Sequence, residues 1–238
     1  MRHCVPMLAL GEIGDRRAAA DRRGRGRRIE ELAAAIEHDQ VEILFQPQFA
    51  SRGNRLVGAE ALSRWNHPRL GRIGAEALFD IAERSHHSAE LTRHIAGRAL
   101  AIAARWPQPL RLSLNITATD LHEDDFAGIV VEAAARARFA LDDFGAGFCN
   151  FRYLKRLPLH ILKLDRSMIQ GIVEDERDLA VLRGILAMAR ALDLRVVAEG
   201  IETEEQRAMI AHEGCEKWQG FLGGAPMSAA EFSLIAVR

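Results

Sequence analysis

From Ile29 onward, apolar and polar positions follow the two periods that distinguish helices from strands. Apolar residues three and four positions apart predict helices over 29–38, 75–84, 88–105, 122–137, 149–156, 175–192 and 203–213. Short, nearly continuous apolar runs predict strands at 41–45, 56–62, 110–115, 138–143, 161–165, 194–199 and 217–221. Turn residues at 51–54 separate the first two strands and predict a hairpin.

After this hairpin, strands and helices alternate along the chain. Each strand is apolar along nearly its whole length, as expected for a strand buried on both faces. The pattern therefore predicts an α/β fold in which helices cover a parallel sheet.

The strand at 138–143 ends in two adjacent carboxylates, Asp142 and Asp143, and a glycine loop follows at once, Phe144-Gly145-Ala146-Gly147. In parallel α/β folds, ligands and metals bind at this end of the strands. Two neighbouring carboxylates repel each other unless a cation lies between them, and a hard divalent ion is the usual partner. The alternative is an aspartate pair that opens a turn or caps a helix.

Other predicted strands also end in polar or ionisable residues: Glu60, Asn115, Lys163 and Glu199. Oxygen ligands without a histidine or cysteine set favour Mg²⁺ or Mn²⁺ over zinc. A lysine in the same ring suits the stabilisation of a phosphate, and two hard metals are a standard device for phosphodiester hydrolysis. Each residue alone fits a helix cap or a surface salt bridge, but five agreeing strand ends favour a shared site.

Composition describes an ordinary globular chain of 238 residues, with 48% hydrophobic and 27% charged residues and a net charge of −1. The three cysteines, Cys4, Cys149 and Cys215, are odd in number and lack metal-ligand spacing, which favours a reduced, cytoplasmic compartment. No apolar run approaches the roughly 18 residues of a membrane helix, and no signal-peptide pattern precedes the basic segment. We therefore expect no membrane partner.

The segment 1–28 is rich in arginine: Arg16, Arg17, Arg22, Arg23, Arg25, Arg27 and Arg28. Such a segment is either an arm that binds nucleic acid or membrane, or a solvated linker to an upstream domain. Acidic residues are interspersed and aromatic residues for base stacking are lacking, which favours the linker. We therefore divide the chain into a basic arm, 1–28, and one domain, 29–238, and expect no nucleic-acid partner.

Seven short motifs occur in a defined order: Phe45-Gln46-Pro47, Glu60-Ala61-Leu62, Ser113-Leu114-Asn115, Asp142-Asp143-Phe144-Gly145-Ala146-Gly147-Phe148, Lys163-Leu164-Asp165, Ala198-Glu199-Gly200-Ile201-Glu202 and Gln219-Gly220-Phe221. On these motifs, residues 29–236 resemble the EAL-domain phosphodiesterases, bacterial signalling enzymes that cleave cyclic di-GMP to linear pGpG. The resemblance implies a (β/α)8 TIM-like barrel with an antiparallel strand near its start. It also implies a two-metal Mg²⁺ or Mn²⁺ site, a homodimer and an upstream regulatory domain.

The resemblance assigns the metal ligands residue by residue. Glu60, Asn115 and Asp142 would bind the first metal. Asp142 would bridge to a second metal, which Asp143 helps to hold. Glu199 would complete the network of metals and water.

It also assigns the remaining site residues. Lys163 would contact the attacking water and act in catalysis together with Glu60 and Glu199. The side chains expected to touch the dinucleotide or to order the site are those of Gln46, Arg64 and Gln219. Glu202 would support the loop that follows Asp143.

One β/α unit of the family is missing from this sequence. The family carries a Glu-x-Thr-Glu strand and a helix before the Asp-Asp strand, whereas here the predicted helix ending near Ala137 runs almost directly into Phe139. Without residues 1–28 the 238-residue chain leaves 210 residues, short of the roughly 250 of a typical barrel by about one unit of roughly 30 residues.

Two explanations stay open. Either the protein lacks the unit and its metal site is crippled, or the recorded sequence omits a segment of the real polypeptide. The first explanation favours a degenerate EAL domain that acts as a cyclic di-GMP receptor, and the second favours an active phosphodiesterase.

Overall fold

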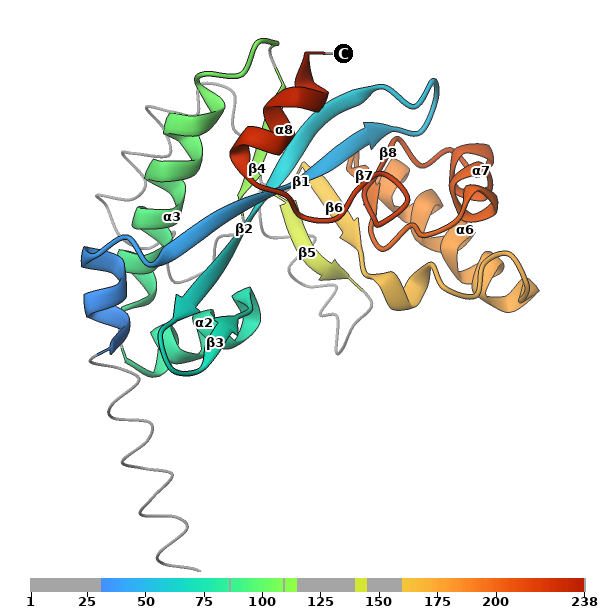
Figure 1. Cartoon of the computed structure of the whole chain (residues 1–238). Coiled ribbons are helices and arrows are strands. Elements are labelled where there is room, and N and C mark those ends of the chain that lie inside the picture. The colour runs from blue at the N-terminus through green and yellow to red at the C-terminus, as the bar shows by residue number, and fades with distance from the viewer. Residues whose placement is uncertain (1–30, 86, 109, 115–139, 145–159, 238) are drawn as a thin grey trace, which may run out of the picture.

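The computed structural model describes residues 31–85, 87–108, 110–114, 140–144 and 160–237 (Figure 1), and for 140–144 the backbone alone. The basic arm, the predicted helices at 122–137 and 149–156, and Asn115 lie outside the described residues. The domain boundary at residue 28 stays a prediction for the same reason.

From Ala75 to Trp218 the described helices and strands follow in the order that the sequence predicts, whereas the short strand before them, at 71–73, was not predicted. The helices are 31–37, α2 (Ala75–Arg84), α3 (Ser88–Ala103), α6 (Glu176–Ala191), α7 (Glu204–His212) and α8 (Ala229–Ala236). The strands are β1 (Val41–Ala50), β2 (Leu56–His67), β3 (Gly71–Ile73), β4 (Arg111–Leu114), β5 (Ala140–Phe144), β6 (Ile161–Leu164), β7 (Arg195–Ala198) and β8 (Lys217–Trp218).

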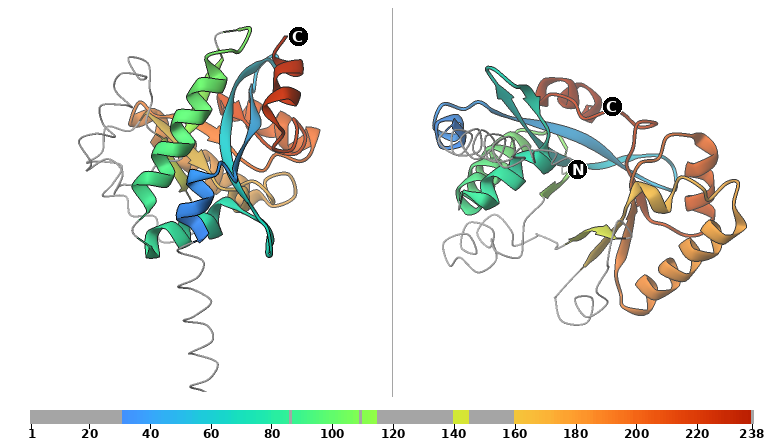
Figure 2. Two further views of the ribbon diagram at one scale, coloured as in Figure 1. Left: turned by 60° about the vertical axis from the view of Figure 1, so that its left-hand side comes forward. Right: turned by 90° about the horizontal axis from the view of Figure 1, so that it is seen from below.

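The strands form one curled sheet in the order β3-β2-β1-β8-β7-β6-β5, with β4 also paired to β2. β1 is antiparallel to both of its neighbours, β2 and β8, whereas β5 to β8 are mutually parallel. Figure 2 shows the curl from two further sides, with the helices outside it. The α/β class and the antiparallel strand near the start are therefore confirmed.

The sheet is a partial barrel. Among the described residues no pairing joins β4 to β5: β4 pairs with β2 and β5 pairs with β6. The missing β/α unit of the sequence belongs between these two strands. The open position in the sheet and the shortfall in the chain therefore coincide.

Several predictions of element bounds need correction. β1 continues to Ala50 rather than ending at Phe45, and only Lys217 and Trp218 of the strand predicted over 217–221 form β8. β2 continues to His67 rather than ending at Leu62, because its second half pairs with β1 and β3. Glu60 therefore lies inside its strand instead of at the end. At the other end of the chain, α8 was not predicted, since it has only 8 residues and little polar alternation.

Two apolar clusters support the sheet. One gathers around Trp65, Phe45 and Phe232, and the other around Leu162 and Trp218. α8 closes the first cluster: the ring centroid of its Phe232 lies 5.9 Å from that of Phe45 and 4.9 Å from that of Trp106. A capping box at Ser228 and Glu231 sets where this helix begins.

We expect Phe232→Ala to lower the free energy of unfolding by about 3–5 kcal/mol, because it empties a fully buried aromatic site. Urea denaturation followed by circular dichroism measures the change. Leu234→Ala on the same helix is the control, since Leu234 is 72% exposed and its loss should change stability little. Equal effects of the two variants would contradict the packing described for α8.

Candidate functional site

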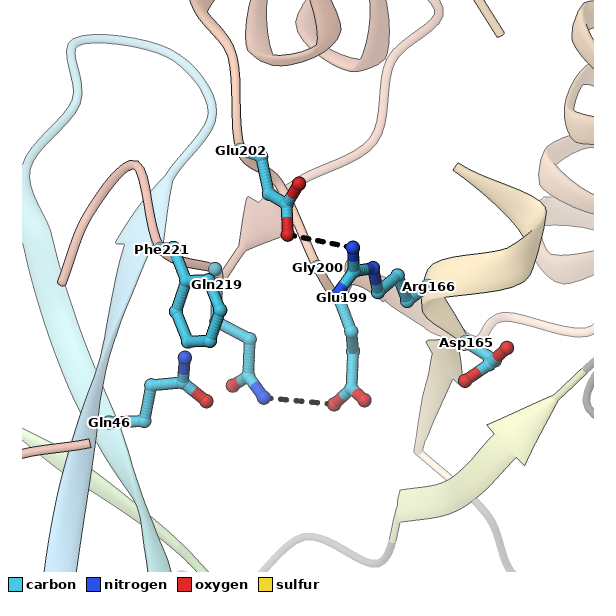
Figure 3. Close-up of a pocket in the computed structure, with 9 residues that line it drawn as sticks. Gln46, Asp165, Arg166, Glu199, Gly200, Glu202, Gln219 and Phe221 are labelled. Carbon is cyan, nitrogen blue, oxygen red and sulfur yellow. Dashed lines mark hydrogen bonds and ion pairs between the residues drawn. The ribbon is translucent and has the colours of Figure 1, made fainter. Parts of the chain in front are cut away.

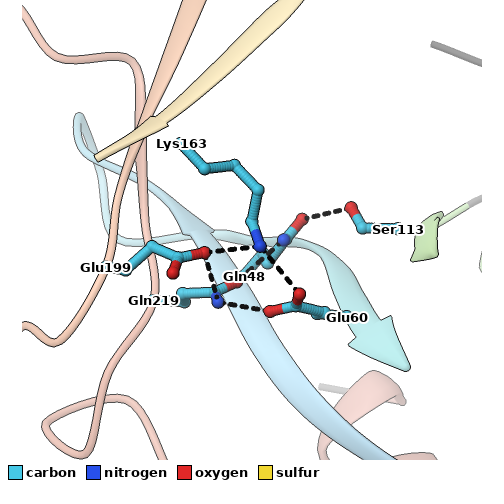
Figure 4. Close-up of polar contacts among 6 residues, drawn as sticks. All are labelled: Gln48, Glu60, Ser113, Lys163, Glu199 and Gln219. Atoms are coloured by element: carbon cyan, nitrogen blue, oxygen red, sulfur yellow. Dashed lines mark hydrogen bonds and ion pairs between the residues drawn. The ribbon is translucent and has the colours of Figure 1, made fainter. Parts of the chain in front are cut away.

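A buried lysine lies between two carboxylates contributed by different parts of the sheet (Figure 4). The Lys163 Nζ atom is 2.7 Å from Glu60 Oε1 and 2.7 Å from Glu199 Oε1. The side chains of Lys163 and Glu60 are 4% and 3% exposed, and that of Glu199 is 17% exposed. Taking three charges out of water is costly, so each must hold good partners.

Gln219 joins the same group. Its Nε2 atom donates to Glu60 Oε2 at 2.5 Å and to Glu199 Oε1 at 3.0 Å. We name Glu60, Lys163, Glu199 and Gln219 the Lys163 cluster. The fold brings it together from four elements: β2, β6, and the residues directly after β7 and β8.

Strand register sets these positions. Glu60 is opposite Gln46 on β1 and opposite Ser113 on β4. Lys163 is opposite Val197 on β7, and Glu199 follows the end of that strand, where its backbone N–H donates to the carbonyl of Leu164. Residues far apart in the sequence thus reach one edge of the curled sheet.

The aspartate pair lies on the strand next to Lys163. β5 pairs with β6, and their register shifts between Leu141 and Phe144, so a bulge falls at Asp142 and Asp143. Bulges of this kind change the direction of side chains and are common beside active sites. The backbone therefore places both aspartates at the strand position beside the Lys163 cluster, while their side chains lie outside the described atoms.

A pocket of about 210 Å³ opens next to the cluster (Figure 3). Its lining residues are Gln46, Asp165, Arg166, Glu199, Gly200, Glu202, Gln219, Gly220 and Phe221. Phe221 is 62% exposed although it is aromatic, and its ring faces this hollow. The pocket therefore combines carboxylates, amides, one arginine and an open aromatic face.

Arg166 and Glu202 form an ion pair on the pocket wall, with Nη2 and Oε1 3.0 Å apart. The side chain of Arg166 lies over Gly200, whose φ is +68° and where a Cβ atom would come within 2.6 Å of the arginine stem. Gly200 thus allows both the turn and the close approach. Beside them, the hydrogen bond from Ser167 lowers the pKa of Asp165.

The other predicted residues are placed as follows. Gln46 lines the pocket, and its Nε2 atom donates to the carbonyl of Gly224 at 3.4 Å. Arg64 lies on β2 and donates to the carbonyl of Ser63 at 2.7 Å, outside the residues that line the pocket. Burial, followed by the nearby charge of Arg72, lowers the pKa of Arg64.

Two expectations reach beyond the described residues. Glu202 was expected to support the loop after Asp143, but that loop falls within 145–159, and the described partner of the side chain is Arg166. Asn115, expected as a ligand of the first metal, is also outside the described part. Both assignments stay predictions.

The described residues supply part of a metal site. No three histidine, cysteine, aspartate or glutamate side chains converge among the residues whose side chains are described. Glu60 and Glu199 do converge, and they offer the oxygen ligands that Mg²⁺ and Mn²⁺ take. Asp142 and Asp143 are on the neighbouring strand, so residue types that suit a hard divalent ion occur on adjacent strands, and the metal site itself stays a prediction.

Several residues of the site were not among the residues predicted from the sequence. Gln48 donates from Nε2 to Gln219 Oε1 at 2.8 Å, and Ser113 Oγ donates to Gln48 Oε1 at 3.2 Å. Phe221 and Arg166 line the pocket beside predicted residues. Phe221 and Ser113 lie inside quoted motifs, so the motif spacing could have drawn attention to them.

Comparison with known proteins identifies the family. The sequence profile described as EAL domain matches residues 29–138 and 130–226, most of the chain. The chain belongs to the EAL-domain family. The two matched segments overlap at 130–138, close to the position where the β/α unit is missing from the sequence.

Two relatives in Pseudomonas aeruginosa are identical to this EAL domain at about 30% of the aligned positions. The bifunctional diguanylate cyclase/cyclic di-GMP phosphodiesterase MucR is 29% identical, over 85% of this chain and 35% of its own length. The cyclic di-GMP phosphodiesterase NbdA is 31% identical, over 84% of this chain and 31% of its own length. The chain thus spans about a third of the length of these curated relatives.

Solved EAL structures share the fold. The phosphodiesterase domain of MucR, in complex with c-di-GMP, is 28% identical and superposes with a TM-score of 0.72 over 85% of this chain and 98% of that one. The EAL enzyme Bd1971, at 24% identity, superposes with a TM-score of 0.82 over 94% of this chain and 71% of that one.

The alignment with MucR supports an internal gap. It runs over 242 positions, although 85% of this 238-residue chain is only about 202 residues. About 40 positions of the relative therefore have no counterpart here, comparable with one β/α unit of roughly 30 residues.

None of the helices in the described residues is long and apolar enough to cross a membrane.

We expect Lys163→Met to lower the free energy of unfolding by about 3–5 kcal/mol at neutral pH, because Glu60 and Glu199 would then face each other without the ammonium between them. The double variant Lys163→Met/Glu60→Gln should recover part of the loss, since it removes one of the two buried charges. Urea denaturation of both variants measures the difference. If the double variant is less stable by the sum of the single changes, the cluster is not a coupled charge group.

Proposed function

We propose that this EAL domain hydrolyses cyclic di-GMP to linear pGpG, with two Mg²⁺ or Mn²⁺ ions bound at the edge of the sheet. The observation that carries the proposal is the buried group of Glu60, Lys163 and Glu199 beside the Asp142–Asp143 bulge. The names of the curated relatives, two of which are cyclic di-GMP phosphodiesterases, support the substrate.

In this proposal Glu60, Asn115 and Asp142 would hold the first metal, Asp142 and Asp143 would hold the second, and Glu199 would complete the network of metals and water. When bound, two such ions activate a water molecule and stabilise charge on the attacking and leaving oxygens of the phosphodiester. The ammonium of Lys163, fixed between Glu60 and Glu199, would hold the attacking water and the reacting phosphate close to these carboxylates.

The pocket would hold one half of the dinucleotide. Its volume of about 210 Å³ is below the roughly 300–1,000 Å³ of whole-ligand sites, so the rest of the ligand would extend past the rim. The exposed ring of Phe221 offers a face on which a guanine can stack. Gln46 and Arg166 provide polar contacts around it, and Arg64 would order the site from β2.

A second function, a receptor that binds cyclic di-GMP without cleaving it, is favoured by one observation. The sheet is open between β4 and β5, where the family carries its Glu-x-Thr-Glu strand. We also expect an upstream regulatory domain, because this chain covers about a third of each relative, and a homodimer.

The direct test is incubation of the purified chain with cyclic di-GMP and either Mg²⁺ or Mn²⁺, with products separated by chromatography. We expect pGpG to accumulate, EDTA to stop its formation, and Glu60→Gln to slow it by at least about 100-fold. Glu42→Gln is the control, because it makes the same chemical change on the neighbouring strand. Glu42 pairs with Arg72 and does not line the pocket.

Ligand that binds but stays intact with either metal would overturn the phosphodiesterase proposal in favour of the receptor. The intact mass of the protein then explains the result. A mass near 26.4 kDa means that the missing unit is absent, whereas a mass larger by several kilodaltons restores it.

We expect Phe221→Ala to raise the dissociation constant for cyclic di-GMP about tenfold, because base stacking contributes about 1–3 kcal/mol. Isothermal titration calorimetry measures it. Phe221→Tyr keeps the aromatic face and should retain the affinity of the unaltered protein. Unchanged binding after Phe221→Ala would exclude the ring as the stacking surface.

A further inference from the structure

A chain of three hydrogen-bonded, uncharged side chains begins at Gln219 of the Lys163 cluster and continues through Gln48 to Ser113. Ser113 Oγ on β4 donates to Gln48 Oε1 on β1 at 3.2 Å, and Gln48 Nε2 donates to Gln219 Oε1 at 2.8 Å (Figure 4). Gln48 is 2% exposed and Gln219 is 3% exposed. We name these three residues the amide relay.

The direction of the relay follows from its charged end. Ionised Glu60 and Glu199 only accept hydrogen bonds, so the NH₂ group of Gln219 must face them and its carbonyl oxygen must face away. That oxygen is buried and needs a donor, which the Gln48 amide supplies. The Gln48 carbonyl then accepts from the Ser113 hydroxyl, so every member has one orientation.

Packing alone does not account for Gln48. An apolar side chain of similar length would fill the same place without the cost of burying an amide. An amide that is 2% exposed and uses both of its ends instead selects one orientation of its neighbour. With the amide of Gln219 turned over, its oxygen would face two carboxylates and repel both.

We propose that Gln48 is a positioning residue for the site: it holds the Gln219 amide so that Nε2 bridges Glu60 and Glu199 and keeps both carboxylates turned toward Lys163. The proposal rests on the proposed function for its effect on catalysis, but the geometry it describes exists without substrate. Gln48 acts through Gln219 and does not line the pocket.

The first test observes the relay directly. In protein labelled with ¹⁵N-glutamine, NMR should show side-chain amide protons of Gln219 shifted downfield by their two carboxylate partners and slow to exchange. Loss of this signal in Gln219→Met assigns it. In Gln48→Met, which keeps the length of the side chain but removes both hydrogen-bonding ends, we expect the pair to move upfield and exchange faster.

The second test is kinetic. We expect Gln48→Met to lower kcat for cyclic di-GMP about tenfold and to change KM less than twofold, because the substrate contacts remain while the carboxylates lose their fixed orientation. Gln48→Glu should be at least as slow, since an ionised carboxylate cannot donate to Gln219 Oε1. A purely space-filling role predicts the opposite: near-normal activity for Gln48→Met, which preserves the shape.

Gln108→Met is the matched control. Gln108 also donates a hydrogen bond of 2.8 Å from Nε2, to the Ala236 carbonyl, but Gln108 is exposed and is not among the residues that line the pocket. Its variant should retain both the kcat and the Gln219 amide signal. If Gln48→Met fails to fold, Ser113→Ala, which removes only the outer donor, is used in its place, with an expected loss of about threefold.

A Gln48→Met protein with an unchanged Gln219 signal and an unchanged kcat would overturn the inference, as would equal losses in Gln48→Met and Gln108→Met. If the unaltered protein cleaves no cyclic di-GMP, the proposed function fails. The amide signals alone then decide whether the relay exists.

Discussion

The contact of Lys163 with Glu60 and Glu199 is the constraint on which the arrangement of the site depends. A buried ammonium and two carboxylates are tolerable only when the ammonium is within hydrogen-bond distance of each carboxylate, here 2.7 Å for both pairs. The three residues come from β2, β6 and the end of β7. These strands must therefore curl toward one another, and the antiparallel β1 between β2 and β8 closes that side of the curl.

Uncharged side chains extend this constraint outward. Gln219 divides its two N–H groups between the carboxylates, and Gln48 and Ser113 complete its hydrogen bonding from β1 and β4. Apolar clusters on either half of the sheet hold these strands in place. The charged group thus lies within a rigid frame, as a site needs if carboxylates are to meet a cation and a phosphate in a fixed geometry.

The opening between β4 and β5 separates this chain from a complete barrel. It lies beside the Asp142–Asp143 bulge, so a missing strand affects the side of the site that carries these aspartates more than the lysine side. Glu60, Lys163, Glu199 and Gln219 keep their mutual contacts in spite of it. Because the opening borders the aspartates and leaves the Lys163 cluster intact, ligand binding and hydrolysis need separate measurements in this EAL domain.

By itself, the sequence determined the order of strands and helices, the membership of the EAL family, the missing unit and most of the ionisable site residues. Those features follow from hydrophobic periodicity and from short motifs, which are local properties of the chain. Tertiary structure decided that β2 runs past Glu60, that Gln48 and Ser113 orient Gln219, and that Phe221 and Arg166 border the pocket. Those features depend on register between strands distant in sequence, and the contacts across a curled sheet have no period along the chain.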